Sequence, residues 1–129
     1  IMLKGRFLLD GHTPIVFAST HFDYSDSTTI AMQAETIVPV LEAEGMPAIV
    51  AGDFNCQIGS VPVKYLSEKG MLLSGGAPTW PSDAPRMRLD HIFGFPKEAF
   101  TLEATTEGLA SKYAASDHLP VVSEITVGL

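Results

Sequence analysis

Six polar side chains that could do chemistry lie directly beside apolar runs of the 129-residue sequence. They are His21, Asp53, Asn55, Asp90, Asp117 and His118. Oxygen and imidazole donors without a thiolate suit Mg²⁺, Mn²⁺ or Ca²⁺ better than a structural zinc ion. A carboxylate beside an imidazole suits general-base activation of water. The combination indicates metal-assisted hydrolysis of a phosphate ester, in which the metal neutralises phosphoryl oxygens and a base takes the proton of the attacking water.

Each of these residues also has a purely structural interpretation. Asp53 and Asn55 could form an Asx turn after a strand, and Asp117 could be a turn residue with His118 at the rim. Asp90 is harder to explain in this way, because apolar residues flank it and a partly buried carboxylate needs partners. The six residues are therefore more informative together than separately.

The chain around these residues predicts an alternation of strands and helices. Apolar runs predict strands at 3–9, 15–20, 48–52, 89–95, 100–105 and 121–127. Apolar residues at helical spacing predict one helix from residue 27 or 28 to 44, which Pro39 should kink or split. A second helix is predicted over 61–69, between Pro62 and Gly70.

We expect from this order a mixed α/β fold with a largely antiparallel sheet and helices on one face. The strands at 15–20 and 48–52 are apolar on both faces, as in a sheet that is covered on both sides. Two helices cover one face of a five- or six-stranded sheet. We therefore expect a missing half-domain or a second copy of the chain to cover the other face. Residues beyond the carboxyl ends of strands meet at one rim, so the six polar residues should share one crevice.

The composition excludes several classes of protein. No apolar run approaches the ~18 residues that a membrane span needs. Fifteen acidic residues against eight basic ones give a net charge of −7, which disfavours long nucleic acid as a substrate. The single cysteine, Cys56, excludes an internal disulfide and is interpreted as a small buried residue. No G-x-S-x-G elbow is present, which disfavours a serine hydrolase, and nothing in the sequence fixes the compartment.

Four segments resemble consecutive motifs of the endonuclease/exonuclease/phosphatase superfamily. They are Thr20-His21-Phe22-Asp23, Gly52-Asp53-Phe54-Asn55, Arg88-Leu89-Asp90-His91-Ile92-Phe93 and Ser116-Asp117-His118-Leu119-Pro120-Val121. They occur in the family's order and at family-like spacing, from about Phe17 to the C-terminus. Pro78-Thr79-Trp80 also resembles the segment before the Asp90 motif, although we interpret Trp80 as a core anchor.

The resemblance implies roles in the activation of water and in metal binding. His118 resembles the general base that deprotonates the attacking water, and Asp90 resembles the carboxylate that orients this histidine. Asp117 resembles a carboxylate at the divalent metal or in its water shell, and Asp53 is assigned to the metal as well. The implied cofactor is Mg²⁺, or else Mn²⁺ or Ca²⁺. His91 neighbours Asp90 but should point to the opposite face of its strand.

The resemblance also implies contacts to the substrate. Asp53 and Asn55 resemble the pair that positions the nucleophile and contacts the phosphate. His21 resembles the histidine that hydrogen-bonds a phosphoryl oxygen and steadies the developing charge. The expected substrate is a small phosphate ester, either a phosphodiester or a phosphomonoester.

One part of the family pattern has no counterpart in this chain. The family's first half supplies an asparagine and a glutamate that hold the metal, and no segment before His21 resembles either. The resemblance therefore implies that residues 1–129 are a single partial domain, the C-terminal half of a four-layer α/β/β/α sandwich. We expect the isolated chain to bind metal weakly and to be poorly active. The alternative is a non-catalytic remnant of the same fold that binds phosphate ligands or a protein partner.

Overall fold

Two sheets and two α-helices make up the described part of the chain, residues 1–107 and 115–128, in a computed structural model. The elements are β1 (Met2–Leu9), β2 (Thr13–His21), α1 (Ser27–Glu42), β3 (Ala48–Asp53), α2 (Val61–Lys69), β4 (Met71–Leu72), β5 (Asp90–Phe95), the 3₁₀ turn η1 (Lys97–Ala99), β6 (Phe100–Glu107) and β7 (Val121–Val127). The larger sheet has the order β1-β2-β3-β5-β4, and β2–β3 is its parallel pair. The predicted mixed α/β class with a largely antiparallel sheet is confirmed. Among the described residues, no helix has the length and apolar character to cross a membrane.

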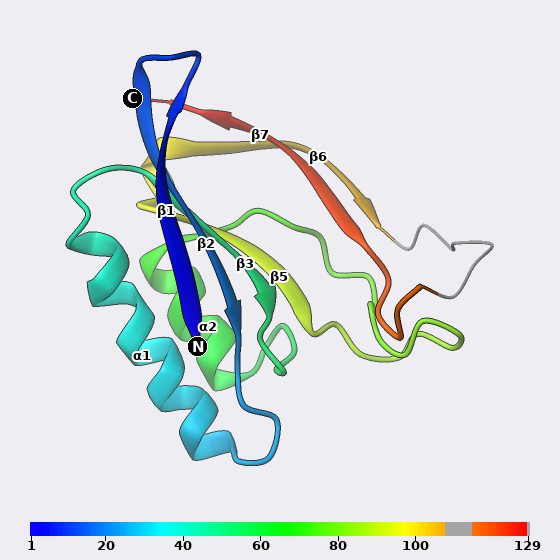
Figure 1. Ribbon diagram of the computed structural model, residues 1–129. Helices are drawn as coiled ribbons and strands as arrows, with labels where there is room; N and C mark the ends of the chain where they lie inside the picture. Colours follow the sequence, from blue (N-terminus) through cyan, green and yellow to red (C-terminus); the bar gives the residue numbers. More distant parts are fainter. Residues whose placement is uncertain (108–114, 129) are drawn as a thin grey trace.

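Both helices cover the same face of the five-stranded sheet, at the lower left of the strands in Figure 1. Side chains at positions i and i+2 of a strand point to the same face, so alternate strand residues meet the helices. The buried residues on this side include Val16, Ala18, Ile37, Leu41, Val50, Leu66 and Phe93. This apolar layer fixes the strands whose ends carry the candidate site.

Helix α1 begins and ends close to the predicted positions. The Asp26 carboxylate accepts the backbone N–H groups of Thr28 and Thr29, both at 3.1 Å, and so caps the first turn. The helix ends at Glu42, two residues earlier than predicted. Pro39 does not split it, because it lies in the last turn, where its missing N–H removes one hydrogen bond near the helix end.

The strands predicted at 100–105 and 121–127 do not lie where we expected them, in a single five- or six-stranded sheet. β6 and β7 do not extend the five-stranded sheet; they form a separate antiparallel pair, at the upper right in Figure 1. Their apolar side chains gather with the second face of the sheet in one cluster: Ile15, Ile49, Leu73 and Phe100, with Leu102, Ile125 and Val127 beside them. Gly94 makes room for this contact, because a Cβ there would collide with the Phe100 ring. The chain therefore covers part of its second face itself.

The rest of the second face stays open over β1 and β2. Phe7 and Phe17 meet edge to face with ring centroids 5.5 Å apart, yet they are 53% and 40% exposed. Leu3 is 76% exposed and points to the same side, since cross-strand partners in the β1–β2 ladder share a face. We call Leu3, Phe7 and Phe17 the open patch. Adjacent exposed apolar side chains of this kind are typical of an interaction surface.

Candidate functional site

Three of the six predicted site residues lie side by side on neighbouring strands. His21 ends β2 and Asp53 ends β3, and the parallel register places these two residues opposite each other. Asp90 begins β5 and opposes Asp53 in the antiparallel ladder. Cross-strand partners point to the same face, so the three side chains line one edge of the second face. Gly52 allows the approach of β2 and β3 here, because a Cβ would collide with the Thr20 carbonyl oxygen.

His118 reaches the same place from the segment before β7. Its Nδ1 lies 2.7 Å from Oδ2 of Asp90 and must donate this hydrogen bond, since an ionised carboxylate only accepts. Its Nε2 lies 3.6 Å from Oδ2 of Asp53. His21 Nε2 lies 3.6 Å from the same Asp53 oxygen. His118 thus has the geometry of a general base whose second nitrogen is held by a carboxylate.

Asn55 supports Asp53 from the turn that follows β3. Its φ of 49° lies in the left-handed region, which asparagine tolerates better than most residues. Its backbone N–H donates to Oδ1 of Asp53 at 2.9 Å, and its side-chain amide donates to the Phe22 carbonyl at 2.8 Å. The Asx turn foreseen as the structural alternative is therefore present. It leaves Oδ2 of Asp53 facing the two histidines.

Asp117 lies at the margin of the group. It is exposed, and its Oδ2 accepts the indole N–H of Trp80 at 3.3 Å. The Asp53–Asp90–His118 group, in which three ligand atoms lie within 4.8 Å of one another, does not include it. Its implied role at the metal stays a prediction.

Both Asp53 and His118 hold a proton more tightly than usual. Partial burial raises the pKa of Asp53 above its ordinary 3.8; the Asn55 N–H opposes this and the Asp90 charge adds to it. Partial burial lowers the pKa of His118, but the hydrogen bond and charge of Asp90 outweigh it, helped by Asp53 and Asp117. The net pKa of His118 is therefore above 6.5. A raised pKa makes the neutral imidazole a stronger base, as a general base near neutral pH requires.

Replacing Asp90 with asparagine is expected to lower the pKa of His118. Asparagine is similar in shape but carries no charge, so it no longer stabilises the imidazolium. The midpoint of the His118 ring-proton titration, followed by NMR in the metal-free chain, should move to lower pH. Asp10→Asn removes the same charge from an exposed residue in the turn between β1 and β2, at the other end of β2 from the site, and should leave the midpoint almost in place. Equal midpoints in the Asp90→Asn variant and the parent chain would show that Asp90 does not stabilise the His118 imidazolium.

The donor set of Asp53, Asp90 and His118 fits a hard divalent cation in part. Mg²⁺ takes six ligands and Ca²⁺ six to eight, mostly oxygens. Asp90 and His118 already bond each other, which suits orientation of the base better than ligation. Asp53 is the carboxylate best placed to hold an ion. Water, phosphate oxygens or further residues would complete its coordination.

Two residues that the sequence did not assign to the site contact its members. Thr79 is fully buried and donates from Oγ1 to Oδ2 of Asp90 at 2.6 Å. The Trp80 ring, interpreted above as a core anchor, is partly exposed and lies 6.5 Å from the His118 ring between centroids. The resemblance of Pro78-Thr79-Trp80 to the family segment was the available signal. A lone hydroxyl residue eleven positions before Asp90 forms no local pattern.

His91 and Cys56 lie outside the site, on the helix-covered side of the sheet. His91 is 1% exposed, and its Nε2 donates to the Cys56 carbonyl at 2.7 Å. Burial lowers the pKa of His91 and raises that of the Cys56 thiol to about 11. Both therefore stay neutral near pH 7. The predictions that His91 faces away and that Cys56 is buried are confirmed.

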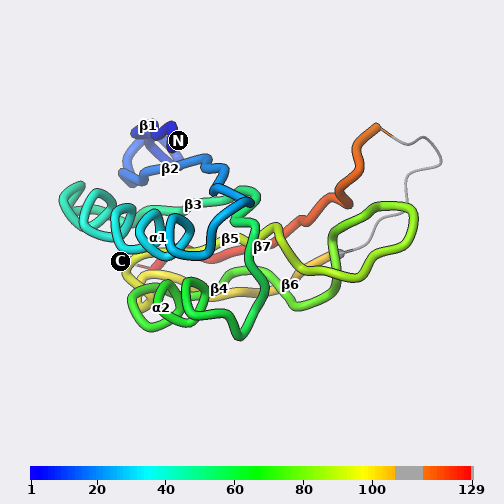
Figure 2. Tube along the Cα trace, turned by 90° about the horizontal axis from the view of Figure 1, so that it is seen from below, coloured from blue at the N-terminus to red at the C-terminus, as the bar shows by residue number. Residues whose placement is uncertain are grey.

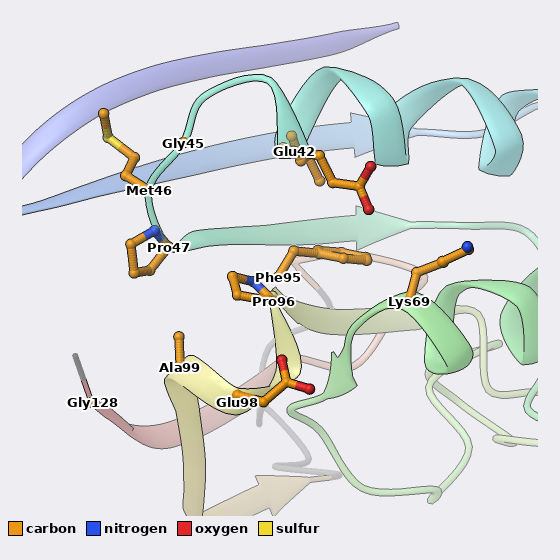
Figure 3. Close-up of a pocket in the computed structure, with 11 residues that line it drawn as sticks. Glu42, Gly45, Met46, Pro47, Lys69, Phe95, Pro96, Glu98, Ala99 and Gly128 are labelled. Atoms are coloured by element: carbon orange, nitrogen blue, oxygen red, sulfur yellow. The ribbon is translucent and has the colours of Figure 1, made fainter.

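A cavity of about 480 Å³ lies at the opposite end of the sheet, near the start of β3 and the end of β5. Figure 3 shows Phe95, Pro96 and Pro47 along it and the charged groups of Glu42, Lys69 and Glu98 around it. The residues that line it include none of the six predicted site residues. We therefore place the candidate chemistry at the Asp53 end of the sheet.

The sequence matches the Endonuclease/Exonuclease/phosphatase family over residues 9–118. The chain belongs to this family. The matched range contains all six predicted site residues, so the family recognised from four short motifs is confirmed.

Solved structures share the family fold. An endonuclease/exonuclease/phosphatase from Bacteroides vulgatus superposes with a TM-score of 0.83 at 18% identity, covering 98% of this chain and 55% of that one. A functionally unknown conserved protein from Enterococcus faecalis V583 gives 0.81 at 19% identity, with 98% and 56% covered. The mannosyl-6-phosphatase Bt3783 of Bacteroides thetaiotaomicron VPI-5482 gives 0.73 at 23% identity, with 97% and 56% covered. The chain thus spans just over half the length of these structures. No curated protein matches the sequence significantly.

Proposed function

We propose that this chain contributes to a site for divalent-metal-dependent hydrolysis of a phosphate ester by a histidine-activated water. The observation that carries the proposal is the position of His118, bonded to Asp90 at 2.7 Å and 3.6 Å from Asp53. Membership of the endonuclease/exonuclease/phosphatase family supports it. A divalent ion, when bound, would neutralise the phosphoryl oxygens.

His118 would act as the general base. Its Nε2 takes a proton from the water as the water oxygen bonds to phosphorus and the ester P–O bond breaks. Asp90 holds the ring through Nδ1 and stabilises the imidazolium that forms. Asp53 would hold the metal, and Asp117 is proposed to act in its water shell. The leaving oxygen takes up its proton from solvent.

His21 and Asn55 would face the substrate. The His21 side chain is 71% exposed beside Asp53, so it can donate to a phosphoryl oxygen that enters from solvent. Asn55 holds Asp53 through its backbone N–H and is proposed to contact the phosphate with its side chain. Losing either residue should weaken substrate binding more than the activation of water.

The proposed substrate is a small phosphate ester rather than long nucleic acid. The net charge of −7 opposes a polyanion, whereas a small ester needs only a local charge match. One similar structure is named a mannosyl-6-phosphatase, which agrees with a small substrate. Because the chain spans just over half of that structure, the complete substrate site is proposed to include further residues.

Hydrolysis of a chromogenic phosphodiester and a chromogenic phosphomonoester tests the function. We expect slow turnover with Mg²⁺ or Mn²⁺ that disappears with a chelator. Turnover that persists in the chelator would contradict a metal-dependent site. No turnover with either ester, together with phosphate-induced NMR shifts at His21 and His118, would favour the non-catalytic phosphate-binding alternative.

We further propose that residues 1–129 are the C-terminal half of a larger domain, and that two copies of the isolated chain associate through the open patch. The exposed pair Phe7 and Phe17 supports this, because water contact is costly for adjacent aromatic rings. Light scattering at micromolar concentration should give the mass of two chains. Phe17→Asp should give one chain, whereas Met32→Asp, at an exposed position of α1, should not. A parent chain with the mass of one chain would rule out this association.

A further inference from the structure

Residues 79–82 hold the segment that carries His118. The Leu119 N–H donates to the Thr79 carbonyl at 2.7 Å, and the Ser82 N–H donates to the Asp117 carbonyl at 2.7 Å. Ser82 Oγ donates to the Ser116 carbonyl at 2.9 Å, and the Trp80 indole adds its bond to Asp117. Figures 1 and 2 both show the loop before β5 beside the segment before β7. The His118 segment is therefore docked on a neighbouring loop rather than free.

Thr79 hydrogen-bonds both Asp90 and the residue that follows His118. Its carbonyl accepts the N–H of Leu119, the residue directly after His118. Its hydroxyl lies 2.6 Å from Oδ2 of Asp90. The side chain is 0% exposed, so no water competes for these bonds.

The three hydrogen-bond partners of the Thr79 hydroxyl fix the direction of its proton. Its oxygen accepts the backbone N–H groups of Leu89 at 3.2 Å and Asp90 at 3.3 Å. A hydroxyl has one proton and two lone pairs, so the proton points to Oδ2 of Asp90. That same oxygen accepts Nδ1–H of His118. Two donors therefore meet on one carboxylate oxygen, and rotation of the carboxylate would break both bonds.

We propose that Thr79 is the positioning residue of the general base. Its hydroxyl fixes the carboxylate oxygen that holds the His118 ring, and its carbonyl fixes the segment that carries the ring. The consequence for catalysis rests on the proposed function, whereas the positioning itself does not. Thr79 acts through Asp90 and does not touch the substrate.

Thr79→Val tests the inference, because valine keeps the shape and removes the hydroxyl proton. The readout is the low-field Nδ1–H proton signal and the ring ¹⁵N shifts of His118 in the metal-free chain, which report its tautomer and hydrogen bond. We expect the parent chain and Thr79→Ser to show one Nδ1–H tautomer with a protected proton. Thr79→Val should lose the protected proton and show mixed tautomers. A protected Nδ1–H in Thr79→Val would overturn the inference.

Two controls separate positioning from general destabilisation. Thr20→Val removes another buried hydroxyl, whose hydrogen bond goes to the Ile1 carbonyl at 2.8 Å, and should keep the His118 signal. If Thr79→Val does not fold, Thr79→Ala takes its place. Thr79→Ala and Thr79→Ser both lack the methyl group, so their difference isolates the hydroxyl. Equal His118 signals in these two variants would also overturn the inference.

Kinetics supply the second readout and separate this inference from the proposed function. In a chain that hydrolyses a chromogenic phosphodiester, Thr79→Val should lower kcat about 10–100-fold, with KM nearly unchanged and Thr79→Ser close to the parent. Unchanged kcat in Thr79→Val would contradict positioning. A parent chain without turnover whose His118 signals respond as expected would contradict hydrolysis by this chain alone and leave the positioning role supported.

Discussion

His118→Ala is expected to lower kcat for metal-dependent phosphodiester hydrolysis about 10²–10⁴-fold, the range typical of a lost general base. KM should change little, because the lost interaction acts on the attacking water in the transition state. The expectation follows from the two contacts of the His118 ring. Its Nδ1 bonds to Asp90, and its Nε2 faces the Asp53 carboxylate. Initial rates at saturating metal, with and without the substitution, give the measurement.

The specificity of this effect can be checked within the same chain. His12→Ala removes an exposed histidine in the β1–β2 turn, far from the site along β2, and should leave kcat unchanged. Added imidazole should restore part of the rate to His118→Ala, because the small base can occupy the space that the ring leaves. A His118→Ala variant with the parental kcat would show that the water is activated by another group.

Asp53→Asn is expected to weaken Mn²⁺ binding at least about tenfold, because site affinity depends strongly on ligand charge. Asparagine keeps the size of the side chain and can keep the Asn55 contact to Oδ1. What it removes is the negative charge between His21 and His118. Titration of Mn²⁺ by electron paramagnetic resonance or calorimetry measures the affinity without requiring turnover.

Asp117→Asn is the matched comparison for this experiment. The resemblance assigns Asp117 to the metal or its water shell, whereas its carboxylate bonds to Trp80 and lies outside the Asp53–Asp90–His118 group. We expect Asp117→Asn to reduce Mn²⁺ affinity less than Asp53→Asn does. A larger loss from Asp117→Asn would identify Asp117 as the principal ligand and would mean that its bond to Trp80 breaks on metal binding.

Local sequence patterns were enough to predict most of the helices and strands and the residue types of the candidate site. The helix predicted over 61–69 is α2, and the strands predicted at 15–20 and 48–52 are β2 and β3. In the structure β2 is longer by two residues at its start and one at its end, and β3 is longer by one residue at its end. Apolar periodicity and glycine or proline boundaries are properties of short segments, so they can be read locally. The same holds for placing His21 and Asp53 at strand ends. β4 was missed because two residues carry no periodicity.

Which of these residues lie in contact depends on how distant segments pack together. The parallel β2–β3 and antiparallel β3–β5 registers align His21, Asp53 and Asp90, and only packing between distant segments sets a register. Packing also turned β6 and β7 over the second face, against the predicted single sheet. Residues 79–82 hydrogen-bond the segment that carries Asp117 and His118. In this arrangement the His118 ring bonds to Asp90, whereas the Asp117 carboxylate bonds to Trp80. Residue types and strand ends are local information, whereas registers and loop contacts depend on free energies shared between distant parts of the chain.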